Sequence, residues 1–259
     1  YTIVTAPAQS TDDGYKDLDP PNVSVTNTDN DSAGITVTNV LGVTTTEAGG
    51  TGTFMVVLNS EPTANVTIPL TSSDATEGTV APASLVFTPS NWNAPQTVTV
   101  TGVDDSVQDG NQPYTILTGP AVSTDTKYSD LDAANVPATN TDNDTAGVTV
   151  TPVTGLVTNE AAGTAEFAIV LNSQPTANVS IAVSSSDLTE GAVSPATVTF
   201  TPANWNAPQK VTVTGVDDNV QDGNQQFTVV TAATVSTDAL YQGIDPANEI
   251  GRASCRERV

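Results

Sequence analysis

The chain has 259 residues, of which 29 are Asp or Glu and only 6 are Lys or Arg, so its formal net charge at pH 7 is −23. Such a surface repels nucleic acid and anionic membranes, because both require a basic footprint on the protein. With no His and a single Cys, the chain lacks the ligands that zinc and copper prefer, and it cannot form an internal disulfide. No apolar stretch is long enough to span a bilayer, so we expect no direct membrane insertion in this fragment.

An internal repeat organises the chain. The segment FTPSNWNAPQTVTVTGVDD at 87–105 recurs as FTPANWNAPQKVTVTGVDD at 200–218, an offset of 200 − 87 = 113 residues. The same offset joins Tyr1 to Tyr114, which places the first residues within an earlier copy. The predicted units are the C-terminal part of a preceding repeat (1–32), a complete repeat (33–145) and a second repeat lacking its last strand (146–249).

The last ten residues, IGRASCRERV at 250–259, depart from the repeat. They hold the only Cys and three of the six basic residues. The segment resembles the in-frame translation of a common sequencing adaptor, so we interpret it as an artefact and leave it out of the predicted fold. A natural basic tail is the alternative.

Alternating or β-branched runs separated by turn residues predict the strands of the complete repeat. In chain order these runs are Ile35–Val40 continuing to Thr45, Thr53–Leu58, Val66–Thr71, a broken segment Thr79–Thr88, Thr97–Val103, Tyr114–Leu117 and Val136–Asn140. Thr, Val and Ala dominate, and no helical pattern appears. About 110 residues are enough to bury one core. We therefore predict an all-β fold of tandem, immunoglobulin-like antiparallel β-sandwiches, each of about seven strands.

Strand order assigns the acidic loops to the two ends of the sandwich. The end reached after the first strand, here called the top, collects acidic residues from at least four chain segments, whereas Asp125, Asp130 and Asp132 fall at the bottom. The converging set at the top is Glu47, Asp74, Asp104, Asp105, Asp109 and Asp142. Ca²⁺ accepts about six to eight oxygen ligands in flexible geometry, and Mg²⁺ is less suited to an all-protein cage. The set predicts a Ca²⁺ site; the alternative is that Asp and Asn simply form turns.

Each repeat contains one Trp in a Pro-flanked Asn-Trp-Asn loop, at Trp92 and Trp205. We expect each Trp to cap its sandwich core. Stacking on a glycan is the alternative.

Four motifs in order carry a resemblance to a known family. They are VTTTEAGGT at 43–51, SSD at 72–74, VDDSVQD at 103–109 and DND at 142–144, and the first three have counterparts in the second repeat. Together they resemble the Calx-beta domain, and the chain is similar to the long repeat arrays of bacterial surface adhesins that contain such domains. The resemblance covers essentially residues 33–249.

The resemblance implies a seven-stranded sandwich that binds several Ca²⁺ ions in its distal loops. The metal ligands it implies in the complete repeat are Glu47, Asp74, Asp104, Asp105, Asp109, Asp142 and Asp144. Those it implies in the second repeat are Glu160, Asp187, Asp217, Asp218 and Asp222. The second repeat departs from the pattern because it lacks the closing Asp-Asn-Asp.

The leading functional hypothesis is a calcium-binding structural repeat of a secreted or cell-surface bacterial adhesin. Ca²⁺ at Asp142 and Asp144 would bridge the top loops of one repeat, with the bottom loop of the next, near Asp238 and Asp245, contributing across the junction. Such ions would rigidify an extended stalk. The expected partners are the neighbouring repeats of the same chain and a host-cell or matrix glycan or protein.

The alternative hypothesis is an extracellular glycan- or protein-binding module that uses the loops of each repeat. An enzyme is not expected, because the chain has no His, no Cys nucleophile outside the tail and no Gly-x-Ser-x-Gly elbow. Paired carboxylates can hydrolyse glycosides, but here they recur at domain ends rather than in a cleft.

Overall fold

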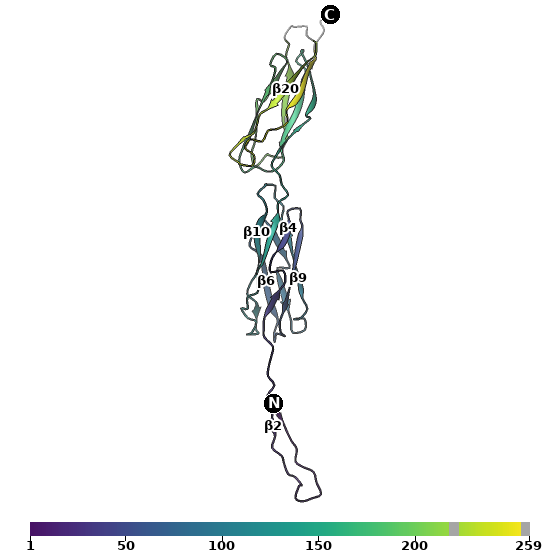
Figure 1. Cartoon of the computed structure of the whole chain (residues 1–259), viewed down its shortest axis with the longest axis vertical. Helices are drawn as coiled ribbons and strands as arrows, with labels where there is room; N and C mark the ends of the chain where they lie inside the picture. Colours follow the sequence, from purple (N-terminus) through teal and green to yellow (C-terminus); the bar gives the residue numbers. More distant parts are fainter. Residues whose placement is uncertain (218–222, 255–259) are drawn as a thin grey trace.

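The computed structural model describes residues 1–217 and 223–254. These residues form an N-terminal extended segment followed by two elongated β-sandwiches arranged end to end (Figure 1). The prediction of an all-β fold is confirmed, since every regular element in the described residues is a strand. Accordingly, none of the described residues belongs to a helix long and apolar enough to cross a membrane.

The first sandwich contains strands β3 to β12 in two sheets. One sheet has the order β3-β5-β9-β7, and the other has the order β11-β6-β10-β12-β4, with β8 paired to β6. The strands are β3 (Ile35–Val37), β4 (Val43–Thr46), β5 (Thr51–Leu58), β6 (Val66–Ser72), β7 (Gly78–Ala81), β8 (Ser84–Phe87), β9 (Gln96–Gly102), β10 (Gln112–Thr118), β11 (Val122–Ser123) and β12 (Val136–Thr141).

The core lies between the two sheets because apolar side chains alternate with polar ones along each strand. In β5, Phe54 and Val56 point inward and are buried, while Met55 between them is exposed. Ile68 and Ile116 of the opposite sheet are also fully buried. Trp92 is partly buried and packs against this core, and Trp205 packs against the second core, as predicted for residues that cap a sandwich.

The predicted continuous run from Ile35 to Thr45 was wrong, because the chain leaves one sheet and enters the other within it. β3 pairs with β5, whereas β4 pairs with β12. The turn between β3 and β4 contains Asn39 at φ 55° and Gly42 at φ 123°, conformations that Asn and Gly adopt at least cost.

The pair formed by β4 and β12 is parallel, with Val43 opposite Ala138 and Thr46 opposite Thr141. Parallel strands end at the same edge of a sheet. The residues that follow β4 and β12 therefore emerge side by side at the top of the sandwich, although almost one hundred positions separate them in the sequence.

The second sandwich repeats this arrangement. Its sheets have the orders β13-β15-β19-β17 and β14-β22-β20-β16-β18, with β21 paired to β16. The strands are β13 (Val148–Thr151), β14 (Thr154–Asn159), β15 (Thr164–Leu171), β16 (Val179–Ser185), β17 (Gly191–Ser194), β18 (Thr197–Phe200), β19 (Gln209–Gly215), β20 (Gln225–Thr231), β21 (Val235–Ser236) and β22 (Glu249–Ser254).

The expectation that the second repeat lacks its last strand was wrong. Residues 249–254 form β22, which runs antiparallel to β20 and parallel to β14. Strand pairing uses backbone N–H and C=O groups that almost every residue carries, so a segment of unrelated sequence can complete a sheet. The adaptor origin of residues 250–259 stays a prediction.

The strands within residues 1–32 are β1 (Thr2–Ile3) and β2 (Val23–Ser24), which pair in a short antiparallel ladder. None of these residues is buried. Tyr15 is 64% exposed, whereas Tyr128, at the equivalent position of the first sandwich, is 1% exposed. The segment thus has the turns of a repeat without the core on which they pack in the first sandwich.

Candidate metal centre

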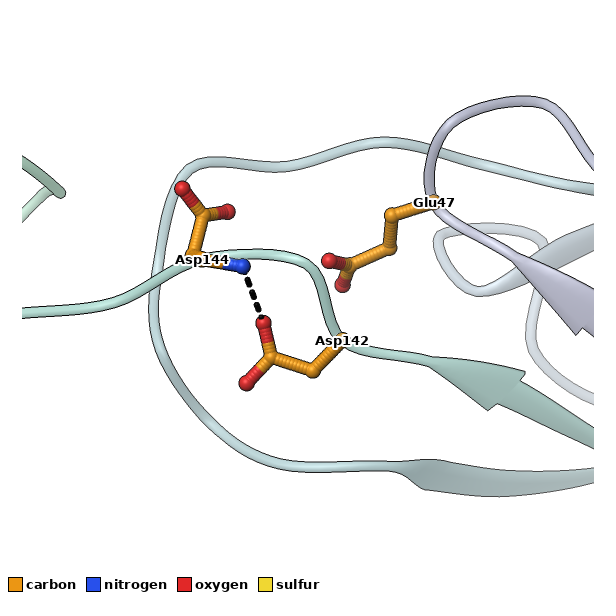
Figure 2. A group of neighbouring side chains, drawn as sticks. All are labelled: Glu47, Asp142 and Asp144. Atoms are coloured by element: carbon orange, nitrogen blue, oxygen red, sulfur yellow. Dashed lines mark hydrogen bonds between the residues drawn. The ribbon is translucent and has the colours of Figure 1, made fainter.

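The first carboxylate group joins the ends of β4 and β12. Glu47, Asp142 and Asp144 each place a carboxylate oxygen so that the three oxygens lie within 4.8 Å of one another (Figure 2). The backbone N–H of Asn143 donates to Glu47 Oε2 at 3.0 Å. The backbone N–H of Asp144 donates to Asp142 Oδ1 at 2.7 Å. These bonds fold the Asp-Asn-Asp turn around the glutamate.

The electrostatics of this group favour a bound cation. Glu47 is only 3% exposed, and burial, together with the negative charges of Asp142 and Asp105, raises the pKa of its carboxyl against the opposing effect of the Asn143 N–H. Burial and the charge of Asp142 likewise raise the pKa of Asp144. Asp144 Oδ2 is buried without a hydrogen-bond partner. A buried carboxylate oxygen without a donor is costly, and a cation ligated there would remove that cost.

A second group lies at the same end of the sandwich. Glu77, Asp105 and Asp109 also bring three carboxylate oxygens within 4.8 Å of one another. Burial, and then the charges of Asp109 and Asp105, raise the pKa of Glu77, while the Asn140 side chain opposes this by donating to Glu77 Oε2 at 3.4 Å. The loop carrying Asp105 is closed by a bond from Val107 N–H to Asp105 Oδ1 at 2.7 Å.

Glu77 belongs to a carboxylate group but is not among the ligands predicted from the sequence. Strand order places it at the top, but the resemblance assigned the ligand of this loop to Asp74. The structure gives Asp74 a different role: its Oδ1 accepts bonds from the Thr76 N–H at 2.9 Å and the Thr76 hydroxyl at 2.5 Å. These bonds lower the pKa of Asp74 and form a turn that aspartate favours. Asp74 belongs to neither group.

Asp104 lies beside the first group without belonging to it. Its Oδ1 accepts a bond from Asn143 Nδ2 at 3.3 Å. Asp142 also accepts a bond from Gly110 N–H, through Oδ2, at 2.7 Å, so the loops after β9 and β12 are tied together. The six grouped carboxylates therefore come from the four loops that sequence order had assigned to the top.

In the second sandwich the predicted ligands are only partly described. Glu160 is partly buried and Asp217 is exposed, while Asp187 caps its own turn through Thr189, as Asp74 does through Thr76. Asp218 and Asp222 lie outside the described residues. Within 1–217 and 223–254, both carboxylate groups belong to the first sandwich.

The loop that carries Asp104, Asp105 and Asp109 also contacts the next sandwich. Its Ser106 carbonyl accepts a bond from the Gln174 N–H at 2.6 Å, and Gln174 lies in the bottom loop between β15 and β16. Gln108 Oε1 accepts a bond from the Ala146 N–H of the linker, also at 2.6 Å. The candidate cation site and the inter-sandwich contact thus share one loop.

The hypothesis placed the bottom loop near Asp238 and Asp245 at an inter-sandwich Ca²⁺ site, but Asp238 makes other contacts. Asp238 Oδ2 and Oδ1 accept bonds from the Thr176 and Leu240 N–H groups at 2.8 and 2.9 Å. Although burial opposes it, these bonds lower the pKa of Asp238. Asp238 therefore holds its own loops together, and neither it nor Asp245 joins a carboxylate group within the described part of the chain.

Acidic residues also meet at the bottom of the first sandwich. Asp29 and Asp31, which precede the sandwich, line a depression of about 350 Å³ with Glu61, Asp125 and Lys127. Asp125 holds this loop by accepting from Thr63 N–H at 2.7 Å. Both ends of the first sandwich thus carry acidic residues where another segment joins it.

The donor chemistry of the two top groups fits Ca²⁺. Each offers three carboxylates, with no nitrogen or sulfur ligand. Hard cations prefer such oxygens, and the several separate loops suit the flexible coordination of Ca²⁺ better than the strict octahedron of Mg²⁺. Glu47, Asp142 and Asp144 would hold one cation, and Glu77, Asp105 and Asp109 another.

The fold and these groups define a class of tandem β-sandwich proteins with oxygen-only candidate cation sites at the domain end. The family model of the Calx-beta domain matches residues 29–142 and 140–251. The chain therefore belongs to the Calx-beta domain family and contains two such domains in tandem.

Similar solved structures include CBD12 from CALX1.2, with 14% identity, a TM-score of 0.40 and coverage of 83% of this chain and 97% of that one. The calcium binding domain CBD12 of CALX1.1 aligns with 12% identity and a TM-score of 0.41 over 81% and 96% of the two chains. The apo form of the Calx CBD1 domain aligns with 14% identity and a TM-score of 0.34 over 42% and 96%. No curated protein matches this chain in sequence.

Proposed function

We propose that this chain is a calcium-binding structural segment of a secreted or cell-surface adhesin, in which Ca²⁺ at the junction between sandwiches stiffens an extended stalk. The observation that carries the proposal is the shared loop between β9 and β10. It brings Asp105 and Asp109 into a carboxylate group and also supplies a hydrogen-bond acceptor for the next sandwich, Ser106 O, and one for the linker, Gln108 Oε1.

Charge repulsion explains how the ion would act. Without a cation, the carboxylates at the top repel one another, and this repulsion favours an open arrangement of the loops. Neutralising that charge stabilises the closed arrangement, and binding to the folded form adds to its stability by mass action. Because the closed loop presents Ser106 and Gln108 to the next sandwich, an ordered loop restricts the angle between the sandwiches.

The proposed role is mechanical and adhesive rather than enzymatic. The neighbouring domains of the same chain are its immediate partners, and a glycan or protein of a host cell or matrix is the proposed distant one. An extracellular location suits the role, since Ca²⁺ sites of extracellular modules need only about 0.1–1 mM affinity. The Trp loops give no specific support to the binding-module alternative, because Trp92 and Trp205 pack against the cores.

The test compares the dimensions of the whole chain, by small-angle X-ray scattering, in Ca²⁺ and in chelator. We expect the maximum dimension to be sharply defined in Ca²⁺ and the ensemble to broaden in chelator. The variant Asp105→Asn/Asp109→Asn should behave in Ca²⁺ as the unchanged chain does in chelator, whereas Asp74→Asn should not. Scattering curves that are the same in Ca²⁺ and in chelator would refute the stiffening role.

A further inference from the structure

The last strand of the second sandwich contains a buried carboxyl group at a position where the first sandwich has an apolar residue. Glu249, at the start of β22, is 0% exposed, and neither of its carboxylate oxygens has a hydrogen-bond partner. It pairs with Val229, which is also fully buried. The equivalent position in the first sandwich holds Val136, buried at 0% opposite Ile116. The surroundings of position 249 are therefore those of an apolar residue.

A second orphaned group lies near the other end of the same strand. In the first sandwich the Thr45 hydroxyl donates to Asn140 Oδ1 at 3.0 Å and lies 2.9 Å from the Tyr114 hydroxyl. The equivalent of Thr45 is Thr158, which is 2% exposed, and its Oγ1 has no hydrogen-bond partner. Ala253 occupies the place of Asn140, and Phe227 that of Tyr114. Both side-chain partners of the hydroxyl have been replaced by apolar residues.

Position 253 nevertheless keeps the strand register of Asn140: Ala253 lies opposite Gln225 and Thr158, as Asn140 lies opposite Gln112 and Thr45. A Cβ added at Gly102 would meet the Thr46 carbonyl oxygen and would lie 2.5 Å from Asn140 Oδ1, so glycine there leaves room for both groups. The equivalent residue in the second sandwich is also glycine, Gly215. Val103, whose carbonyl accepts from Asn140 Nδ2 at 2.9 Å, likewise has a valine, Val216, as its equivalent.

We propose that the position between β14 and β20 is a strand-acceptor site that selects an apolar residue at 249 and an asparagine at 253. The strand Val136–Thr141 of the first sandwich has this pattern. Glu249–Ser254 then occupies this site through backbone pairing, although its side chains at 249 and 253 do not fit; we call this the mismatch. The mismatch begins at Glu249, one residue before the adaptor-like segment. The inference rests on packing and does not depend on Ca²⁺ binding.

The test restores the pattern of the first sandwich one residue at a time in the whole chain. Each sandwich contains one of the two Trp residues, so in a Trp92→Phe background the fluorescence of Trp205 follows the unfolding of the second sandwich. The variants are Glu249→Val and Ala253→Asn. The matched control is Arg252→Thr, which also introduces the residue of the first sandwich but at an exposed position of the same strand.

We expect Glu249→Val to raise the Tm of the second sandwich by at least about 4 °C, because a buried orphaned carboxylate is removed. Ala253→Asn should raise it by a smaller amount, and Arg252→Thr should change it by less than about 2 °C. A double-mutant cycle then asks whether Asn at 253 acts in part through Thr158: its gain should be smaller in a Thr158→Val background. Gains at 249 and 253 no larger than that of the control would overturn the proposal.

A further pair of variants covers the case in which Ala253→Asn does not fold. Thr158→Val should be neutral or stabilising, since the hydroxyl it removes has no partner, whereas Thr45→Val in the first sandwich should lower the Tm reported by Trp92 in a Trp205→Phe background. If Thr158→Val and Thr45→Val destabilised their sandwiches equally, the proposed mismatch in β22 would be contradicted.

Discussion

Individual carboxylates in this chain divide into two kinds according to what faces them. Asp74, Asp125 and Asp187 accept bonds from nearby N–H or hydroxyl groups, and those bonds lower the pKa of each. Glu47 and Glu77 are partly or wholly buried and face other carboxylates, so the pKa of each is raised. The first kind stabilises turns with its charge already satisfied. The second kind gains most from a bound cation.

This distinction predicts which substitutions weaken Ca²⁺ binding. Glu77→Gln removes one charge from the second carboxylate group, and we expect the affinity for Ca²⁺ to fall by at least about tenfold, or about 1.4 kcal/mol. Asp74→Asn, in the same loop, should change the affinity by less than about threefold. Calorimetric titration of the whole chain measures both, and equal losses would contradict the assignment of the ligand to Glu77.

The buried carboxyl of Glu249 predicts a pH dependence for the second sandwich. Burial raises its pKa from 4.5 to about 7. The folded state therefore holds a proton that the unfolded state releases between these values. The contribution is fully present below pH 4.5 and is lost as the pH rises through about 7, with a total change of up to about 3 kcal/mol. Urea unfolding followed by Trp205, in chelator between pH 4 and 8, should show this loss in the unchanged chain and not in Glu249→Gln.

At the scale of the elements, the parallel pair of β4 and β12 decides where the cation site forms. Sequence patterns predicted both strands but merged β4 with β3, because alternation alone does not show the point at which a strand changes sheets. The turn at Asn39 to Gly42 makes that change. Once β4 lies beside β12, Glu47 and Asp142 follow directly at the shared end of the two strands.

Close packing at this end predicts a large effect of Gly102→Ala. The new Cβ would meet the Thr46 carbonyl oxygen and would lie 2.5 Å from Asn140 Oδ1, so β4 or the Asn140 amide must move. We expect a loss of about 1–3 kcal/mol in the stability of the first sandwich, with a weaker Ca²⁺ affinity because Asn140 supports Glu77. Trp92 fluorescence in a Trp205→Phe background reports the loss, and the reciprocal Trp92→Phe background should show no change in the second sandwich.

Viewed as a whole, the molecule is a row of bodies joined by short linkers (Figure 1). The proposed stiffening therefore acts through individual contacts at the junction between the sandwiches. Between the sandwiches those contacts include the bonds from Gln174 N–H to Ser106 O and from Ala146 N–H to Gln108 Oε1. The loop that provides both acceptors also carries Asp105 and Asp109 of a carboxylate group, so under the proposed function ion binding would be coupled to the shape of the whole chain.

The junction can be weakened without touching a cation ligand. Gln108→Ala removes the acceptor for the linker, so we expect a broader distance distribution between labels on the two sandwiches in Ca²⁺, with Ca²⁺ affinity changed by less than about threefold. Gln174→Ala is the matched control, because its junction bond comes from the backbone and its side chain donates instead to Pro202 O within the second sandwich. A distribution as narrow in Gln108→Ala as in the control would show that this bond does not restrain the junction.

The sequence by itself determined the all-β class, the 113-residue repeat and the end of the sandwich at which acidic loops gather. These properties follow from local patterns: alternation, turn residues and the parity of strand order. Tertiary structure alone decided that Glu77 rather than Asp74 enters a carboxylate group, and that one loop serves both the cation site and the next sandwich. It also decided that residues 249–254 complete a sheet. Contacts of this kind depend on which side chains already have a hydrogen-bond partner and on which strand edges remain open, and only the packed structure provides that information.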